Sequence, residues 1–242
     1  MTANKKKHTA LKTVRNILLI LFAVCVIAAG AVTLRGYHMY TCALERLPVL
    51  KAAGEVRAKD GFTPLSELPD TYLDAVVAAE DHRFYEHGGV DYIAIGRALY
   101  NDIKTMSFAE GGSTITQQLA KNLYFTQEKE LTRKVAEVFM AWDLERRFSK
   151  EEILELYVNS IYFGSGCYTV GDASRVYFQK EPSDMTDYQC TLLAGIPNAP
   201  SVYDLNENPD LASERQRQVV GLMVKYAGLS RDKADLLLCG AN

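Results

Sequence analysis

The sequence predicts an all-α domain preceded by one membrane-spanning helix. Three observations support this prediction. Residues 17–34 form an uncharged apolar run, close to the roughly 20 residues that cross a bilayer as a helix. From residue 68 onwards, apolar residues recur at helical spacing, and few segments alternate as strands do. The composition, 48% hydrophobic and 24% charged, is that of an ordinary globular chain.

The membrane helix is predicted at residues 17–35, after a cytoplasmic segment at residues 1–16. Five basic residues precede the apolar run: Lys5, Lys6, Lys7, Lys12 and Arg15. An excess of Lys and Arg marks the cytoplasmic side, so the rest of the chain is expected outside. A cleaved signal peptide is the competing interpretation, because residues 28–31 (AAGA) resemble a small-residue cleavage site. The anchor is favoured because the run exceeds the usual 7–15-residue signal core, and the adjacent lysines disfavour a buried core helix.

Residues 36–66 are interpreted as a linker or stalk, and residues 67–242 as the folded domain. Leu73, Val76, Val77 and Phe84 fall at helical spacing on one face of the first helix of the domain, and Tyr92, Ile95, Ala98 and Leu99 do so in the next helix. Residues 103–112 are expected to form a loop. Further helices are expected at 113–124, 130–147, 150–158, 168–178, 184–194, 209–226 and 230–239. Ser149 and Glu152 have the spacing of a capping box at the start of one of them.

Charge and cysteine content exclude some function classes. The formal net charge of -3 disfavours a nucleic-acid binder that depends on a basic surface. None of the five cysteines stands in a C-x-x-C pair, which excludes zinc-ribbon and thioredoxin-like sites. Cys25 lies in the apolar run. Pairing among Cys42, Cys167, Cys190 and Cys239 is left open, with four free thiols at least as favoured.

Glu80 is the first candidate for chemistry. It follows Val76 and Val77 by four and three residues, so it shares their apolar helix face. A carboxylate on such a face costs free energy unless it is paired or protonated. Desolvation would raise its pKa, which suits a general base or acid. A structural ion pair with a buried arginine is an equal alternative from this segment alone.

Two further segments carry polar groups at helical spacing. Thr114, Gln117, Gln118 and Lys121 fall on one face of the helix that follows Gly111-Gly112. Arg133 and Lys134 stand four and three residues before Glu137, where the three side chains can form ion pairs. A solvated helix face and a surface salt-bridge cluster are the plain alternatives. Taken together, two carboxylates and three cations suit displacement of a phosphate leaving group by a hydroxyl that needs a base. A glycosidase has the opposite need, an acid for its leaving group.

Five motifs follow one another in the chain: Glu80-Asp81-x-x-Phe84-x-x-His87-x-Gly89, Gly112-Ser113-Thr114-Ile115-Thr116-Gln117-Gln118, Arg133-Lys134-x-x-Glu137, Lys150-x-x-Ile153-Leu154-Glu155-x-Tyr157-x-Asn159, and Ala173-Ser174-x-x-Tyr177-Phe178-x-Lys180. Together they resemble the peptidoglycan glycosyltransferases of glycosyltransferase family 51, over about residues 65–225. The resemblance implies a helical, lysozyme-like domain in a single-pass protein of the bacterial plasma membrane, with its catalytic domain outside the cytoplasm.

The resemblance also implies an activity, the polymerisation of glycan strands from lipid II. By analogy Glu80 deprotonates the 4-hydroxyl of the acceptor sugar. That oxygen attacks C1 of the donor with inversion, which forms a β-1,4 link and releases undecaprenyl pyrophosphate. Glu137 is implied as the second catalytic acid, and Lys121, Arg133 and Lys134 as contacts of the diphosphate. The other positions that the resemblance implies as cleft-shaping or substrate-contacting are Asp81, Phe84, His87, Thr114, Gln117, Gln118 and Asn159.

Expected partners are lipid II, the growing glycan strand, the membrane and other cell-wall synthesis proteins, but no nucleic acid. A divalent cation, Mg²⁺ or Mn²⁺, often assists such enzymes at the pyrophosphate. The sequence shows no dedicated metal ligands, so no cofactor is expected to be required. The loop at 103–112, with Met106 and Phe108, corresponds to a mobile membrane-facing region of the family.

Some residues depart from the family pattern or point elsewhere. Residues 167–172 and Gln179 differ from the usual sequences, which affects details of the donor side. Ser230 and Lys233 match an S-x-x-K acyl-enzyme signature, but no K-T-G follows, so we interpret that match as chance. A lytic glycan-cleaving enzyme is one alternative, although it leaves the cations without a task. A non-catalytic cell-wall assembly protein is the other, although it has no need of both carboxylates.

Overall fold

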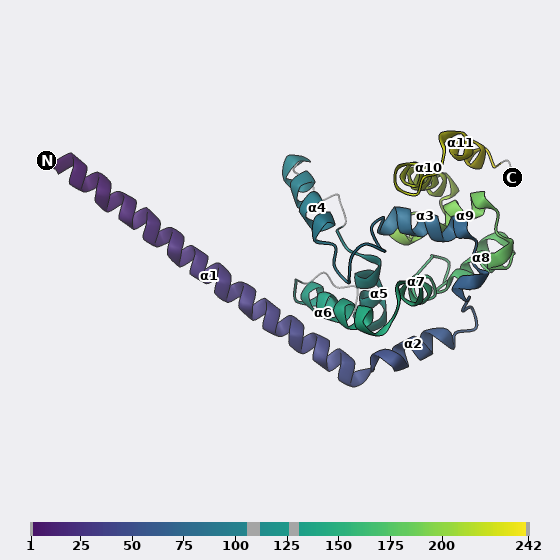
Figure 1. Cartoon of the computed structure of the whole chain (residues 1–242), viewed down its shortest axis with the longest axis horizontal. Helices are drawn as coiled ribbons and strands as arrows, with labels where there is room; N and C mark the ends of the chain where they lie inside the picture. Colours follow the sequence, from purple (N-terminus) through teal and green to yellow (C-terminus); the bar gives the residue numbers. More distant parts are fainter. Residues whose placement is uncertain (1, 106–111, 126–130, 241–242) are drawn as a thin grey trace.

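The computed structural model describes residues 2–105, 112–125 and 131–240, and all its regular elements are helices (Figure 1). Among these residues there is no strand, which confirms the predicted all-α class. The α-helices are α1 (Thr2–Arg46), α2 (Val49–Arg57), α3 (Asp70–Glu80), α4 (Tyr92–Thr105), α5 (Ile115–Tyr124), α6 (Leu131–Arg147), α7 (Lys150–Val158), α8 (Val170–Phe178), α9 (Asp187–Gly195), α10 (Pro209–Tyr226) and α11 (Arg231–Leu238). Short 3₁₀ turns lie at Leu65–Glu67, Pro182–Asp184 and Ile196–Asn198.

Helix starts follow the local sequence closely. The predicted capping box is confirmed: Ser149 Oγ accepts from the N–H of Glu152, and Glu152 Oε2 accepts from the N–H of Ser149. Thr114 forms the same reciprocal pair with Gln117 at the start of α5. Each box satisfies backbone donors that a helix leaves unpaired at its first turn. These caps fix where α5 and α7 begin, and both helices carry groups of the site.

Two groups of helices surround one hydrophobic core. Helix α3 packs against α9 and α10, while α5 packs against α6 and α7. The largest side chains that are fully buried include Tyr72 of α3, Leu119 of α5 and Tyr157 of α7, together with Phe84 and Phe163 from the connections. The carboxyl end of α3 and one face of α5 are therefore held at fixed positions beside each other.

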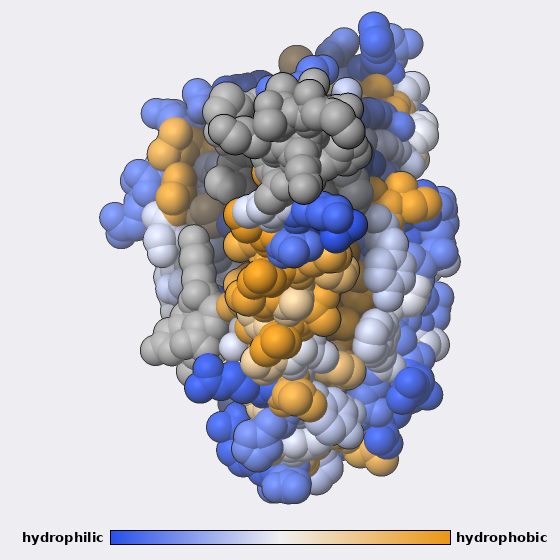
Figure 2. Space-filling view, turned by 90° about the vertical axis from the view of Figure 1, so that its left-hand side faces the viewer, coloured by the Kyte–Doolittle hydropathy of each residue, from blue (hydrophilic) through white to orange (hydrophobic). Residues whose placement is uncertain are grey.

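Helix α1 is longer than the predicted membrane segment at 17–35. It runs unbroken to Arg46, and its stretch Lys12–Arg46 contains a window with a mean hydropathy of 2.9, apolar enough to cross a membrane. Figure 2 shows the molecule from the side from which α1 projects. A band of hydrophobic residues (orange) is visible there, with hydrophilic residues (blue) near its upper end. The helix continues past residue 35 because residues 36–46 pack against α6.

The contact between α1 and α6 is close and specific. A Cβ atom added to Gly36 would lie 2.6 Å from the Cβ of Val135, so only glycine fits there. Tyr37 and Tyr40 stack near Phe139, with ring centroids 5.2 and 5.9 Å away. The helix that crosses the membrane is thus joined directly to the helix that carries Arg133, Lys134 and Glu137.

The interpretation of residues 36–66 as a linker or stalk is wrong. Val49, Ala52, Ala53 and Val56 of α2 are buried in the main core. Beyond α2, the backbone N–H and C=O of Thr63 are both bound by the side chain of Asn159. The apolar residues of α2 recur at helical spacing, but the prolines and glycines on either side suggested a linker instead.

Helix α4 forms where the spacing predicted a helix, but much of its apolar face is exposed. Tyr92 is 70% exposed and Ile95 is 41% exposed, whereas Ala98 is buried. Periodicity indicates that a helix has an apolar face, but it does not identify what covers that face. The expected loop at 103–112 begins later than predicted, because α4 runs to Thr105. Residues 106–111, with Met106 and Phe108, lie outside the described residues.

Candidate active site

Glu80 is the last residue of α3, whose other buried residues include Tyr72, Ala75 and Val76. Its Oε2 accepts a hydrogen bond from Gln118 Nε2 over 2.8 Å. Its Oε1 is buried and has no hydrogen-bond partner among the described residues. Burial raises the pKa of Glu80, and the bond from Gln118 and the charges of Arg215 and Lys121 only partly offset that rise. A carboxylate with a raised pKa and one unoccupied oxygen is suited to accept a proton.

Gln118 is itself held in place from a third helix. Its Oε1 accepts from the hydroxyl of Tyr157 on α7 over 3.1 Å. Burial raises the pKa of Tyr157 well above its ordinary value, so this hydroxyl stays protonated as a donor. With its oxygen fixed by Tyr157, the Gln118 amide presents its N–H to Glu80. The orientation of Glu80 therefore depends on α3, α5 and α7 together.

Glu137 is the second buried carboxylate, with 1% of its surface exposed. As its spacing predicted, it pairs on α6 with Arg133 through Oε1 and with Lys134 through Oε2, the latter at 3.0 Å. Lys134 Nζ also donates to Ser113 Oγ over 2.6 Å, which joins α6 to the segment just before α5. A single buried carboxylate thus holds two cations at one end of the site. Arginine can bind phosphate oxygens bidentately, and lysine can bind them as a point charge.

Lys121 interacts electrostatically with both carboxylates. Burial lowers the pKa of Lys121, and the charges of Glu137 and Glu80 oppose that effect while Arg133 and Lys134 reinforce it. The ammonium is therefore within electrostatic reach of both acids and both neighbouring cations. The structure brings together Glu80, Gln118, Lys121, Arg133, Lys134 and Glu137 as the sequence analysis expected. Three cations around two acids form a site that suits an anion beside a base.

Asp81 and His87 stabilise the connection between the two helices that carry Glu80 and Gln118. Asp81 Oδ2 accepts from the backbone N–H of Ile115, the first residue of α5, over 3.1 Å. Asp81 Oδ1 also pairs with His87 Nε2 at 2.9 Å. The other ring nitrogen of His87 bonds to the carbonyl of Gly88. Burial alone would lower the pKa of His87, but its bonds to Asp81 and Gly88 raise it overall. The pair fixes the end of α3 against the start of α5.

Four of the residues expected to shape the cleft or contact substrate are held by contacts within the fold. Phe84 is fully buried beneath the ammonium of Lys150. Thr114 and Gln117 form the capping box of α5, and Thr114 Oγ1 also donates to the carbonyl of Gly89. Asn159 is fully buried, with bonds to Thr63 and to the carbonyl of Glu155. Each has its polar atoms bonded within the protein or has no polar atom, and Thr114 also lines a cleft beside Glu80. These residues therefore shape the site, and their contact with substrate stays a prediction.

A cleft of about 350 Å³ opens beside Glu80 and contains residues that the motifs did not predict. His82 stacks on Tyr226 with ring centroids 3.8 Å apart, and Arg97 Nη1 lies 3.3 Å from His82 Nε2. Lys225 also lines the cleft, and its ammonium lies over the Tyr226 ring. These residues come from α4, from α10 and from the turn after Glu80. Only the three-dimensional structure brings them together, so spacing along the chain gave no signal.

One group of side chains in the described part of the chain has metal-ligand chemistry. One ligand atom each from Asp81, His87 and Asp91 lies within 4.8 Å of the others. These atoms already have partners: Asp81 binds His87 and Ile115, Asp91 Oδ1 caps the start of α4, and Asp91 Oδ2 pairs with Arg83 at 3.1 Å. The group therefore does not fit a metal ion without losing these bonds.

A family model and the curated relatives agree on the family to which this chain is similar. Residues 49–224 match the family model described as Transglycosylase. The chain is 45% identical to penicillin-binding protein 1F of Bacillus subtilis over 170 residues, which is 70% of this chain and 24% of that protein. It is 40% identical over 191 residues to a protein of Cupriavidus necator with the provisional name transglycosylase, covering 79% of this chain and 82% of that one.

A solved structure is also similar to part of the chain. Penicillin-binding protein 1A from Haemophilus influenzae matches 51% of this chain and 15% of its own length, with 27% identity and a TM-score of 0.36. The chain thus spans about a quarter of the length of penicillin-binding protein 1F but most of the length of the Cupriavidus protein. The family match begins at residue 49, where α2 begins, and so includes most of the segment first interpreted as a linker.

Proposed function

Because the chain belongs to the transglycosylase family, we propose that it polymerises the glycan strands of peptidoglycan from lipid II at the outer face of the bacterial plasma membrane. The observation that carries the proposal is the buried carboxylate of Glu80, which has one oxygen without a partner, beside the cations around Glu137. A proton acceptor next to an anion site is what transfer from a diphosphate donor requires.

In the proposed reaction Glu80 acts as general base. Its unpaired Oε1 accepts the proton of the acceptor's 4-hydroxyl while that oxygen attacks C1 of the donor sugar. The bond from C1 to the diphosphate oxygen breaks, with inversion, and a β-1,4 link forms. Burial supports this role because it raises the pKa of Glu80 and so makes the carboxylate a stronger base. Gln118 and Tyr157 keep the carboxylate in one orientation.

The leaving diphosphate is assigned to Lys121, Arg133 and Lys134. Negative charge builds on the diphosphate as C1–O breaks, and preorganised cations stabilise that charge. Glu137 holds Arg133 and Lys134 in place, and its negative charge offsets the repulsion between these cations. We propose that no resident metal is required, because three cations already face the diphosphate. A divalent cation that arrives with the substrate would lie next to Glu137, the carboxylate of this cluster.

The position of α6 supports a lipid-linked donor. Gly36 follows the apolar run by two residues, and it contacts Val135, which is next to Lys134 in the chain. The cation cluster therefore lies close to the end of the membrane-spanning part of α1. A diphosphate at a membrane surface would reach these cations without its lipid leaving the bilayer. The exposed apolar face of α4 gives the domain a second surface suited to the membrane.

Orientation and partners belong to the proposal. The basic residues before the apolar run place residues 1–16 in the cytoplasm and the domain outside. The growing glycan strand would be the second substrate after the first transfer. Other cell-wall synthesis proteins would be neighbours at the membrane.

The deciding experiment uses the full chain in detergent or in liposomes with labelled lipid II. We expect glycan polymer from the wild type and none from Glu80→Gln, at equal folded fraction by circular dichroism. Soluble fragments released from finished glycan would favour a lytic enzyme instead. If the wild type neither makes nor cleaves glycan, the proposal is wrong and a non-catalytic assembly role is favoured. Adding a chelator tests whether a metal ion is required, and we expect the polymer yield to persist.

A further inference from the structure

The cleft beside Glu80 is the first of three cavities that share lining residues. His82, Ala78 and Tyr226 line both this cleft and a cavity of about 200 Å³ on the other side of the His82–Tyr226 stack. Asp74 and Ala227 then line both that small cavity and a third cavity of about 520 Å³. The three cavities therefore adjoin one another along α3 and α10, from Glu80 to α11, and are here together called the α3–α10 groove.

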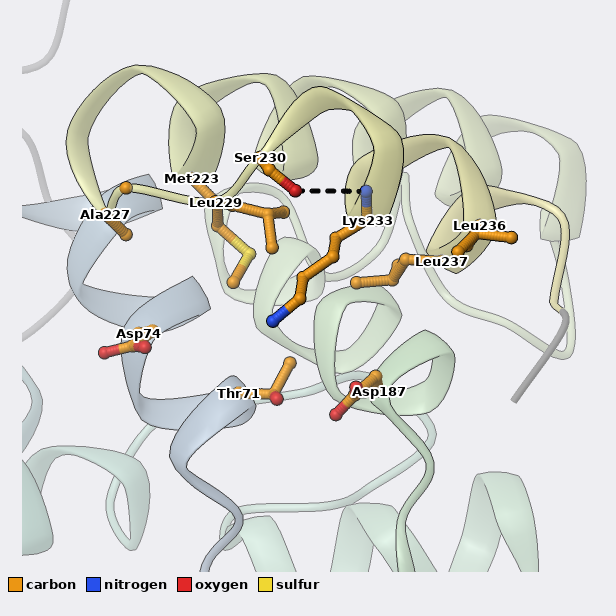
Figure 3. A pocket seen from close by; sticks show the side chains of 11 residues that line it. Thr71, Asp74, Asp187, Met223, Ala227, Leu229, Ser230, Lys233, Leu236 and Leu237 are labelled. Atoms are coloured by element: carbon orange, nitrogen blue, oxygen red, sulfur yellow. Dashed lines mark hydrogen bonds between the residues drawn. The ribbon is translucent and has the colours of Figure 1, made fainter.

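The distal cavity of this groove contains both signs of charge on an apolar floor (Figure 3). Lys233 extends from α11 into the cavity, toward Thr71 and Asp74 of α3, and Asp187 of α9 lies nearby. The floor and walls are apolar and include Met223, Leu229, Leu236 and Leu237. Neither Lys233, Asp74 nor Asp187 forms an ion pair within the described residues. The cavity thus offers one cation, two carboxylates and hydrophobic contact to a ligand.

The S-x-x-K match is explained by the same view. Ser230 caps α11, and its Oγ accepts from the backbone N–H of Lys233 over 3.3 Å. The ammonium of Lys233 points away from Ser230 into the cavity (Figure 3). The cap and the cavity therefore use different parts of Lys233, so its side chain can be changed without removing the cap.

We propose that this distal cavity binds the peptide carried by the peptidoglycan precursor whose sugar occupies the groove beside Glu80. Lys233 would bind a free peptide carboxylate, and Asp74 and Asp187 would bind an amino group. The leucines and Met223 would contact the alkyl parts of the peptide. The inference rests on the proposed function, because that function is what brings a peptide-bearing sugar to Glu80.

The distances along the fold agree with this assignment. Asp74 and Glu80 lie on the same helix, six residues apart, which corresponds to roughly 9 Å along its axis. An extended peptide advances about 3.3 Å per residue. A peptide of a few residues attached to a sugar at Glu80 is therefore long enough to span this rise along α3 to the cavity that Lys233 lines. A nucleotide or a plain lipid would leave either the carboxylates or the ammonium without a partner.

The test compares two ligands and two variants of the full chain in detergent. The ligands are lipid II with a free carboxylate at its peptide terminus and the same molecule with that carboxylate converted to an amide. Equilibrium binding is measured for each, and polymer formation is recorded in parallel. For the wild type we expect the amide to bind about tenfold more weakly, as for loss of one charge-assisted hydrogen bond. For Lys233→Met we expect both ligands to bind with that weaker affinity.

Arg231→Met is the matched control, because it removes the same charge from the exposed first turn of α11 without touching the cavity. It is expected to keep the wild-type preference for the carboxylate. If wild type and Lys233→Met discriminate between the ligands equally, the inference is wrong, whether or not polymer forms. If discrimination depends on Lys233 but no polymer forms, the inference stands and the polymerase proposal is wrong.

Discussion

Gln118 donates its amide N–H to Glu80 over 2.8 Å, while the other oxygen of the Glu80 carboxylate is buried and has no hydrogen-bond partner in the described part of the chain. One oxygen is thus used to orient the group, and the other is left for chemistry. Fully satisfying a buried carboxylate would stabilise the fold and lower its pKa. The arrangement instead preserves basicity at some expense of stability, as is common at active sites.

Replacing Glu80 by Gln should separate activity from stability. Loss of the base is expected to lower the polymerisation rate by about 10²–10⁴-fold, measured with labelled lipid II. Arg231→Met, which lies away from the site, should retain the wild-type rate. Polymerisation by Glu80→Gln at a near wild-type rate would show that another group takes the proton.

The same substitution is expected to raise the melting temperature at neutral pH by a few degrees. The pKa of Glu80 is raised in the folded protein, so the folded state holds this proton more tightly than the unfolded chain. Stability from this group is therefore highest below its ordinary pKa and falls as pH rises through the folded pKa. The difference between variant and wild type should shrink at pH 4. Glu207→Gln, at an exposed position, is the control and should show no such pH dependence.

Gln118→Met should move the pH profile of the reaction. The bond from Gln118 lowers the pKa of Glu80, so removing it is expected to raise that pKa further. The acidic limb of kcat/KM against pH should then shift to higher pH, because more Glu80 is protonated and inactive there. Tyr157→Phe frees the Gln118 amide to rotate and should give a smaller shift in the same direction. An acidic limb that stays in place in both variants would contradict the role of Gln118 as the residue that orients Glu80.

Gly36→Ala should disturb the joint between membrane helix and domain. The added Cβ would lie 2.6 Å from Val135, so α1 and α6 must move apart. We expect destabilisation of about 1–3 kcal/mol, as for overpacked cores, measured by thermal unfolding in detergent. Gly30→Ala is the matched control on the same helix, because nothing lies within 4 Å of its added Cβ. Equal melting temperatures for the two variants would show that the contact at Gly36 is loose.

His87→Gln should flatten the pH dependence of stability above pH 6.5. The pKa of His87 is raised in the folded protein, so its pairing with Asp81 stabilises fully below 6.5, the ordinary value. That contribution is lost as pH rises through the folded pKa. Melting temperatures at pH 6, 7 and 8 should fall more for the wild type than for His87→Gln. His38→Gln, on an exposed part of α1, should behave like the wild type.

Local signals in the sequence predicted much of the fold and the acid–base groups of the site. The capping box at Ser149 involves residues three apart, so the pattern is visible in the chain itself. Thr114 and Gln117 have the same spacing, but they were interpreted as part of a polar helix face. The same holds for Glu137 with Arg133 and Lys134, which share two turns of one helix. Glu80 was placed correctly on its apolar face, because burial of α3 follows from its periodicity.

The errors arose where function or packing depends on residues far apart in the chain. Asn159 was expected to shape the cleft or contact substrate; the structure shows it bound to Thr63, 96 residues away, and no local pattern indicates that bond. Residues 36–66 resembled a linker because burial of α2 depends on core residues far along the chain. His82, Arg97 and Tyr226 meet beside Glu80 only through the packing of α4 and α10 around it. Spacing rules describe neighbours along a helix and carry no information on such pairings.

Because helix α1 is unbroken, its rise and rotation per residue determine the height and orientation of the domain above the bilayer. Each residue inserted between the apolar run and Gly36 would lift the cleft by about 1.5 Å and rotate it by about 100° around the helix axis. Inserting a whole helical turn would restore the original orientation of the cleft about the helix axis but leave the cleft higher by about 5.4 Å. Membrane thickness and the length of one helix would thus jointly set the height above the membrane at which this protein meets the proposed lipid-linked substrate.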